Sequence, residues 1–254
     1  MRTRQRGEEN GNQLIQAGNA LQELVWTTRC VICDTPGELI CAECARALPY
    51  IDLWQACPRC GTPFGRLICT ECNHLMLAKR GRQALPYERC TSAVIHTDAV
   101  RHIVTAFKDG GERRLAPLIA AYSAATVSPG ISHTNAVLTF IPSTNRARRQ
   151  RGFDHTEETA RFLAVHLHLP LARIFSRPRG RDQRGLSREE RQLNMAGKLQ
   201  IRPYWQGRLP RRVIVYDDVY TTGATLFAAS DALRTGGCTV VRCVTFSRVW
   251  DNPR

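Results

Sequence analysis

The sequence predicts an α/β fold, with a mostly parallel sheet flanked by helices and a small N-terminal cysteine-rich zinc module. Two observations predict it: strand-like and helix-like apolar segments alternate in the C-terminal part of the chain, and paired cysteines are concentrated ahead of them. The 254 residues, of which 43% are hydrophobic, suffice for one large domain or two unequal ones. We expect a polar tail and a helix over residues 1–27, the zinc module over 28–77 and the α/β domain over 78–250.

The spacing of apolar residues predicts the elements of the α/β domain. Val100, Ile103, Val104 and Phe107 recur at helical spacing, whereas the unbroken apolar run at 213–216 is typical of a buried strand. Because strands and helices alternate, the strands should lie parallel, and ligands should bind beyond their carboxyl ends. Strands are expected at about 92–96, 136–141, 171–175, 213–216 and 239–246, and further helices at about 114–125, 155–167 and 225–235.

Hydropathy indicates where in the cell the protein is located, and charge indicates which kinds of ligand or partner it binds. No apolar stretch is long enough to cross a bilayer, and the polar first residues lack the apolar region of a secretory signal, so we expect a cytoplasmic protein without membrane insertion. The formal net charge is +14, and the segment 146–212 alone holds 17 Lys or Arg and 6 Asp or Glu, a net charge of +11. This concentration favours a polyanionic ligand or partner, namely phosphate, pyrophosphate or nucleic acid. A solubilising arginine-rich surface is the alternative.

Eight of the 11 cysteines form four Cys-x-x-Cys pairs, a spacing that lets two thiolates on one tight turn reach the same metal ion. Two pairs complete a tetrahedral zinc site, which should be structural because four thiolates leave no open position for water. The short gaps favour pairing between neighbours, and a crossed arrangement (first with third, second with fourth) is the alternative. The expected ligands are Cys30, Cys33, Cys41 and Cys44 for one ion, and Cys57, Cys60, Cys69 and Cys72 for the other.

Other roles for the cysteines are disfavoured. Disulfides do not persist in a reducing cytosol, and no βαβ pattern surrounds the pairs as a redox dithiol would require. Cys90, Cys238 and Cys243 stand alone and are expected to be small buried side chains.

A strand, two acids and a hydroxyl-rich loop follow one another at 213–225. The loop opens a helix, so its backbone N–H groups can bind a phosphate, and Gly223 allows a close approach of the backbone. The two acids cannot face a phosphate, because like charges repel, and are placed to accept hydrogen bonds from neighbouring sugar hydroxyls. The segment predicts a sugar-phosphate site made of Asp217, Asp218, Thr221, Thr222, Gly223, Ala224 and Thr225.

All 13 positions of this segment resemble the phosphoribosyl-pyrophosphate (PRPP) signature of type I phosphoribosyltransferases. Three further stretches, at 107–112, 151–155 and 183–194, narrow the resemblance to the ComF family. That family carries an N-terminal double zinc ribbon ahead of a phosphoribosyltransferase domain, which implies the type I phosphoribosyltransferase fold for 78–250. The sequence departs from the family at Asp154 and His155, where the family commonly has Asn-Gln.

The resemblance implies roles for further residues. The loop after the strand at 136–141 would be the pyrophosphate loop, and residues 177–191 would form a lid that excludes water. Mg²⁺ bound with PRPP would be a cofactor besides the two zinc ions. His155, His166 and His168 are interpreted as structural. The pyrophosphate loop would comprise Pro142, Ser143, Thr144 and Asn145, and the candidate phosphate or lid contacts are Lys108, Arg148, Arg151, Arg184 and Arg191.

Two functions fit these features. The resemblance implies a PRPP-binding phosphoribosyltransferase, linked to DNA uptake in natural transformation and to competence or recombination proteins. The alternative is a non-catalytic protein that senses PRPP or a nucleotide and holds single-stranded DNA on its basic surface. The PRPP motif favours ligand binding in both cases, and the excess of positive charge favours the second.

Overall fold

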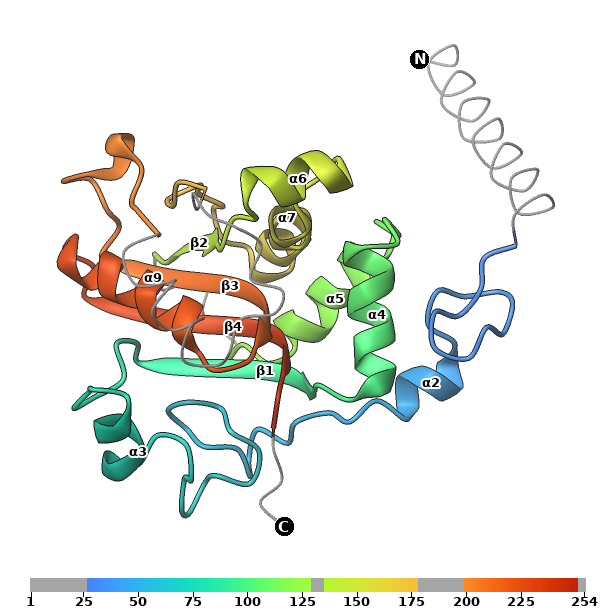
Figure 1. Ribbon diagram of the computed structural model, residues 1–254, viewed down its shortest axis with the longest axis horizontal. Coiled ribbons are helices and arrows are strands. Elements are labelled where there is room, and N and C mark those ends of the chain that lie inside the picture. The colour runs from blue at the N-terminus through green and yellow to red at the C-terminus, as the bar shows by residue number, and fades with distance from the viewer. Residues whose placement is uncertain (1–26, 129–134, 178–198, 251–254) are drawn as a thin grey trace, which may run out of the picture. The chain divides into compact units, whose positions relative to one another are not determined.

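The computed structural model describes residues 27–128, 135–177 and 199–250 (Figure 1). Its contacts divide the chain into two units, Met1–Leu48 and Pro49–Arg254. The boundary at Leu48 lies inside the segment 28–77 that the sequence assigns to one zinc module. As a result, the first set of four cysteines belongs to the smaller unit, and the second set belongs to the unit that contains the sheet.

The described part of the smaller unit consists of turns and one short helix, α2 (Ala42–Arg46). A bridge between Arg29 and Pro36 closes the turn that carries Cys30 and Cys33. Cys41 is the N-cap of α2, and its Sγ accepts a hydrogen bond from the N–H of Cys44 at 3.5 Å.

A four-stranded parallel sheet organises the larger unit. Its order is β1-β4-β3-β2, and every neighbouring pair of strands is parallel. The predicted strand at about 171–175 is represented only by isolated bridges, one of which joins Leu171 in parallel to Leu138 of β2. The strands are β1 (Arg89–Ile95), β2 (Val137–Phe140), β3 (Arg212–Tyr220) and β4 (Val240–Arg248).

Helices cover both faces of this sheet (Figure 1). Alternate residues of β3 point to opposite faces: Val213 and Val215 pack in the core that contains α9, whereas Ile214 and Tyr216 pack in the core that contains α5 and α7. This three-layer arrangement confirms the predicted α/β class. The covering helices are α5 (Leu115–Ala124), α7 (His155–Leu167) and α9 (Ala224–Thr235).

The other described elements lie around the sheet. The predicted apolar stripe of α4 (Asp98–Lys108) is buried, whereas α6 (Asn145–Arg151) has no buried residue. The structure also contains α3 (His74–Lys79) and the 3-10 turn η2 (Pro203–Trp205). Within the described ranges, no helix combines the length and the apolar character needed to cross a membrane.

One predicted strand boundary is wrong in a way that matters for the site. The apolar run predicted a strand ending at residue 216, but β3 continues to Tyr220. Its neighbour β4 supplies backbone partners over this extra length, pairing Asp217 with Thr245 and Tyr220 with Arg248. Since β2 ends at Phe140, opposite Tyr216, the two acids lie in the part of β3 that projects beyond β2.

Candidate functional site

The acid pair Asp217–Asp218 lies at the carboxyl edge of the sheet, where parallel α/β sheets bind ligands. Asp217 is buried, and its Oδ1 accepts the N–H of Asp218 at 2.9 Å. Burial raises the pKa of Asp217 to about 7; nearby Lys108 opposes this rise, and Asp154 adds to it. Asp217 therefore changes its charge near neutral pH.

Lys108, the last residue of α4, reaches this pair from another element. Its Nζ forms an ion pair with Asp218 Oδ2. Both side chains are largely removed from water, at 21% and 14% exposure, so the attraction between them is only weakly screened. The structure thus brings together Lys108 and Asp218, which the sequence analysis assigned to separate parts of the site.

His155, the first residue of α7, contacts the same carboxylate. Its Nε2 lies 3.3 Å from Asp218 Oδ2, and its Nδ1 lies 3.1 Å from Ser143 Oγ and 3.4 Å from Arg151 Nη1. Burial, together with Lys108 and Arg151 nearby, holds the pKa of His155 well below its usual value, so the imidazole is neutral. A neutral imidazole has one N–H donor and one acceptor nitrogen, so the ring can take part in the polar contacts on both of its sides.

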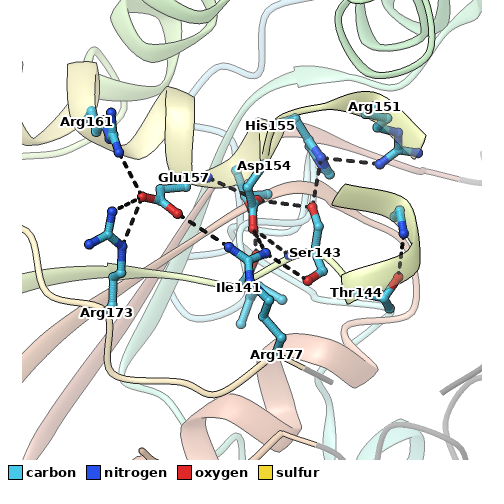
Figure 2. A network of polar contacts seen from close by, with 12 residues as sticks. Ile141, Ser143, Thr144, Arg151, Asp154, His155, Glu157, Arg161, Arg173 and Arg177 are labelled. Carbon is cyan, nitrogen blue, oxygen red and sulfur yellow. Dashed lines mark hydrogen bonds and ion pairs between the residues drawn. The ribbon is translucent and has the colours of Figure 1, made fainter. Parts of the chain in front are cut away.

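Asp154 fixes the loop that follows β2 (Figure 2). Its carboxylate accepts hydrogen bonds from the backbone N–H of Ser143 at 3.1 Å and from the Ser143 hydroxyl at 3.0 Å. Arg177 Nη1 lies 2.5 Å from Asp154 Oδ2 and also donates to the Ser143 carbonyl at 3.2 Å. Asp154 also caps the start of α7, so one buried carboxylate orders both the loop and the helix.

Glu157 extends this network (Figure 2) and also lines a groove beside the loop. It forms ion pairs with Arg161, Arg173 and Arg177. Burial acts to raise its pKa, but the hydrogen bonds from Arg173 and Arg161 outweigh this effect and hold the pKa below its usual value. The groove has a volume of about 730 Å³ and is lined in part by Pro142, Asn145, Arg173, Arg177 and Arg202.

The hydroxyl-rich loop turns directly from β3 into α9. Gly223 is the N-cap of α9 and lies in the left-handed region, with φ of 79°, and a Cβ at this position would clash with the Tyr220 side chain. Glycine is thus required both by the backbone angle and by the close packing. The Thr222 hydroxyl accepts the N–H of Ala224 at 3.3 Å, while Thr221 is exposed.

The other predicted site residues form no hydrogen bond or ion pair with the acid pair Asp217–Asp218 in the described part of the chain. Thr144 caps α6, and Asn145 is the first residue of that helix, so the loop after β2 is shorter than predicted. Arg151 lies 3.2 Å from Asp109 and contacts His155, whereas Arg148 is exposed on α6. Arg184, Arg191 and nearly all of the predicted lid lie outside the described residues.

The eight paired cysteines form two groups of four that fit zinc. In each group, the four Sγ atoms lie within 4.8 Å of one another, which confirms pairing between neighbours and excludes the crossed arrangement. The 3.6 Å separations of Cys33 from Cys41 and of Cys57 from Cys72 approach the roughly 3.8 Å expected around a tetrahedral zinc ion with 2.3 Å bonds. Cys90, Cys238 and Cys243 are buried, as predicted. The first tetrad is Cys30, Cys33, Cys41 and Cys44, and the second tetrad is Cys57, Cys60, Cys69 and Cys72.

Comparison with known proteins agrees with the two tetrads. The family description "Double zinc ribbon domain" matches residues 21–76, which include both of them. Competence protein ComFC of Bacillus subtilis (strain 168) is 26% identical over 250 residues, covering 92% of this chain and 98% of ComFC. The chain is ComF-like. Among solved structures, orotate phosphoribosyltransferase from Aeropyrum pernix is 20% identical with a TM-score of 0.31, covering 62% of this chain and 80% of the other.

Sequence reasoning missed the position of His155, which it grouped with the structural histidines. One signal was available: His155 follows the helix cap Asp154 and opens the helix next to the predicted pyrophosphate loop. A helix that begins at this edge of the sheet directs its first side chains toward the ligand side.

Proposed function

We propose that this ComF-like chain binds PRPP at the carboxyl edge of its sheet and transfers the phosphoribosyl group to a nitrogen acceptor. The observation that supports this most is the convergence of separate segments on one carboxylate. Asp218 contacts both Lys108 and His155, and His155 reaches Ser143 in the loop after β2.

Each part of the ligand has a chemically suitable place. Asp217 and Asp218 would accept hydrogen bonds from the ribose hydroxyls, and the loop 221–225 would bind the 5′-phosphate with N–H and hydroxyl groups. The pyrophosphate would contact the loop that contains Ser143, beside the arginine-lined groove. Mg²⁺ bound with the ligand would neutralise part of the pyrophosphate charge, and the carboxylate oxygens of the acid pair are ligands of the type it prefers.

In the proposed reaction, the bond between ribose C1 and the pyrophosphate oxygen breaks, and a bond between C1 and the acceptor nitrogen forms. The electron pair of the broken bond leaves with pyrophosphate, and the sugar acquires oxocarbenium character. The protein would contribute position and electrostatic stabilisation, with the acids holding the ribose and the arginines facing the leaving group.

Lys108 is placed to serve two partners. In the structure it neutralises Asp218. A bound phosphate at this edge would offer a second anion to the same ammonium group, while His155 keeps its own contact with Asp218. Ligand binding would then exchange one ion pair for another instead of leaving a buried charge unpaired.

Titration calorimetry with PRPP and Mg²⁺ tests the binding step. Asp217→Asn with Asp218→Asn should weaken binding by at least tenfold, because each hydrogen bond to a charged acceptor is worth roughly 1.5–3 kcal/mol. A matched control, Asp98→Asn with Glu88→Gln, removes the same charge from exposed positions. Equal affinities for the wild type and the acid-pair variant would refute this site.

A separate assay distinguishes an enzyme from a sensor. Release of pyrophosphate from PRPP, dependent on one member of a panel of nucleobases, would establish transfer. PRPP binding without any release would favour the non-catalytic function.

Single-stranded DNA binding is the second candidate function, and the surface of α6 supports it. Three arginines, Arg146, Arg148 and Arg149, are exposed on this short helix. Exposed arginines close together on one element suit a phosphate backbone. The similarity to a competence protein supports a role of this surface in DNA uptake together with competence or recombination proteins. Transformation frequency in a deletion strain complemented with the α6 variants tests that role.

A further inference from the structure

Arg248, the last residue of β4, is completely buried although it is charged. Its guanidinium donates to the Cys60 carbonyl at 2.8 Å and to Thr62 Oγ1 at 3.0 Å, and it forms an ion pair with Glu71 Oε2 at 2.6 Å. All three partners belong to the segment that carries the second tetrad. A buried charge is tolerated only when it is paired and hydrogen-bonded, and this segment supplies partners for both terminal nitrogens of Arg248, Nη1 and Nη2.

The other face of the same guanidinium covers Tyr220. The Arg248 Cζ lies 3.8 Å from the centroid of the Tyr220 ring, within the range of a cation–π contact. Tyr220 is buried as the last residue of β3, and its hydroxyl lies 3.3 Å from that of Tyr87. The ring is therefore held from two sides.

Tyr220 in turn supports the loop proposed to bind phosphate. Its side chain occupies the space in which a Cβ of Gly223 would lie. Gly223 thus packs directly on the Tyr220 ring, and a displacement of the ring would displace the turn at Gly223. One continuous set of contacts runs from the Cys60 carbonyl through Arg248 and Tyr220 to Gly223.

A second contact fixes the same cysteine turn to the sheet. The N–H of Cys90 in β1 donates to the Arg59 carbonyl at 2.8 Å. Gly61 lies so close to β1 that a Cβ there would clash with the Cys90 carbonyl. The turn that carries Cys57 and Cys60 therefore packs directly on the edge strand. The first tetrad belongs to the other unit.

We propose that Arg248 is a positioning residue, through which the zinc-bound second tetrad holds Tyr220 and the loop 221–225 in the conformation that binds phosphate. The consequence for PRPP affinity rests on the function proposed above, whereas the order of the loop does not. The two tetrads then have different roles, because the contacts through Arg248 start from the second.

Hydrogen–deuterium exchange on the full-length zinc-loaded protein tests the connection without any ligand. Arg248→Lys keeps the charge but removes the planar group that stacks on Tyr220. We expect amides 221–227 to exchange about tenfold faster, with β2 and α5 unchanged. Arg242→Lys, on the same strand but paired with Glu88 at the surface, is the matched control and should leave these amides unchanged.

Three further comparisons make the result decisive. Cys60→Ser should accelerate exchange in the same amides, whereas Cys33→Ser should not. Thr62→Val removes a single bond to Arg248 and replaces the other variants if either fails to fold. Unchanged exchange at 221–227 in Arg248→Lys, or equal effects of Cys33→Ser and Cys60→Ser, would overturn the proposal.

PRPP titration separates this proposal from the function on which it rests. A wild-type protein that binds PRPP should lose about tenfold in affinity on Arg248→Lys. If the wild type does not bind PRPP, the proposed function fails, and the exchange data still decide whether Arg248 orders the loop.

Discussion

The imidazole of His155 lies 3.3 Å from the carboxylate of Asp218 and joins it to the loop after β2 through Ser143. The acid pair and the loop after β2, which we propose to face the ligand, are thereby connected by one buried, neutral ring. Its Nε2 faces the carboxylate of Asp218, the acid that we propose accepts a hydrogen bond from a sugar hydroxyl.

His155→Ala should weaken PRPP binding roughly tenfold, because it removes the ring that lies between Asp218 and Ser143, and one lost hydrogen bond of the ring is worth about 0.5–1.5 kcal/mol. His155→Gln retains one donor and one acceptor and should recover part of the affinity. Calorimetric titration of both variants measures the difference. Equal losses for Ala and Gln would show that the ring contributes packing and not its hydrogen bonds.

The raised pKa of Asp217 predicts a pH-dependent affinity. Its pKa of about 7 results from burial, and a bound cation or sugar hydroxyl favours the ionised form. Below pH 7, binding must therefore release a proton, so affinity should fall as the pH is lowered, by at most about tenfold per pH unit. Above pH 7 the group is already ionised and the dependence should level off.

Calorimetry in buffers of different ionisation enthalpy measures the released proton directly. PRPP itself titrates in this range, so the relevant quantity is the difference between the wild type and Asp217→Asn. Identical proton release by the two proteins would exclude Asp217 as the source.

Asp154→Asn should destabilise the larger unit by about 3 kcal/mol, because it removes the nearer of the two carboxylates that pair with the Arg177 guanidinium and leaves only Glu157. Chemical denaturation measures the change in the free energy of unfolding. Asp98→Asn breaks an exposed pair with Arg101 and should cost about 1 kcal/mol or less. A loss of similar size in both variants would contradict a structural role for the buried pair.

Local sequence patterns predicted the elements well where one face is buried. The helix expected at 155–167 is found as α7, with Asp154 as its cap. The apolar run at 213–216 located β3 but not its end, because strand pairing with β4 extends it through two acids. The spacing of apolar residues predicts which side chains are buried. It does not predict whether the backbone beyond the apolar run pairs with a neighbouring strand.

Contacts between distant segments could not be predicted in the same way. Lys108 meets Asp218, and Arg248 meets Cys60, only after helices and strands have packed. Spacing of the cysteines, in contrast, predicted both tetrads, because each depends on short turns. The position of Arg248 at the end of a largely apolar strand indicates, from the sequence alone, a buried charge that needs a partner. The sequence does not indicate which residue that partner is.

The first tetrad should be separable from ligand binding. We expect about two zinc ions per chain in protein purified without added metal, and about one in Cys30→Ser. Because the first tetrad belongs to the other unit, PRPP affinity in this variant should remain within about twofold of the wild type. Elemental analysis and titration of the same preparation measure both quantities. One zinc ion or none in the wild type would exclude two sites.

The exposed arginines of α6 predict salt-dependent binding of single-stranded DNA. Arg146→Glu with Arg148→Glu and Arg149→Glu should weaken binding strongly and flatten its salt dependence, because affinity that comes from phosphate contacts depends on counterion release. Fluorescence anisotropy between about 50 and 200 mM salt measures both the affinity and its salt dependence.

The matched control, Arg29→Glu with Arg101→Glu and Arg208→Glu, makes the same change in charge at exposed arginines elsewhere. If both triple variants lose affinity equally, net charge alone explains binding; if the wild type does not bind even at the lowest salt, α6 has no role in holding DNA. Loss confined to the α6 variant, together with competition by PRPP, would show that the DNA surface adjoins the loop that contains Ser143.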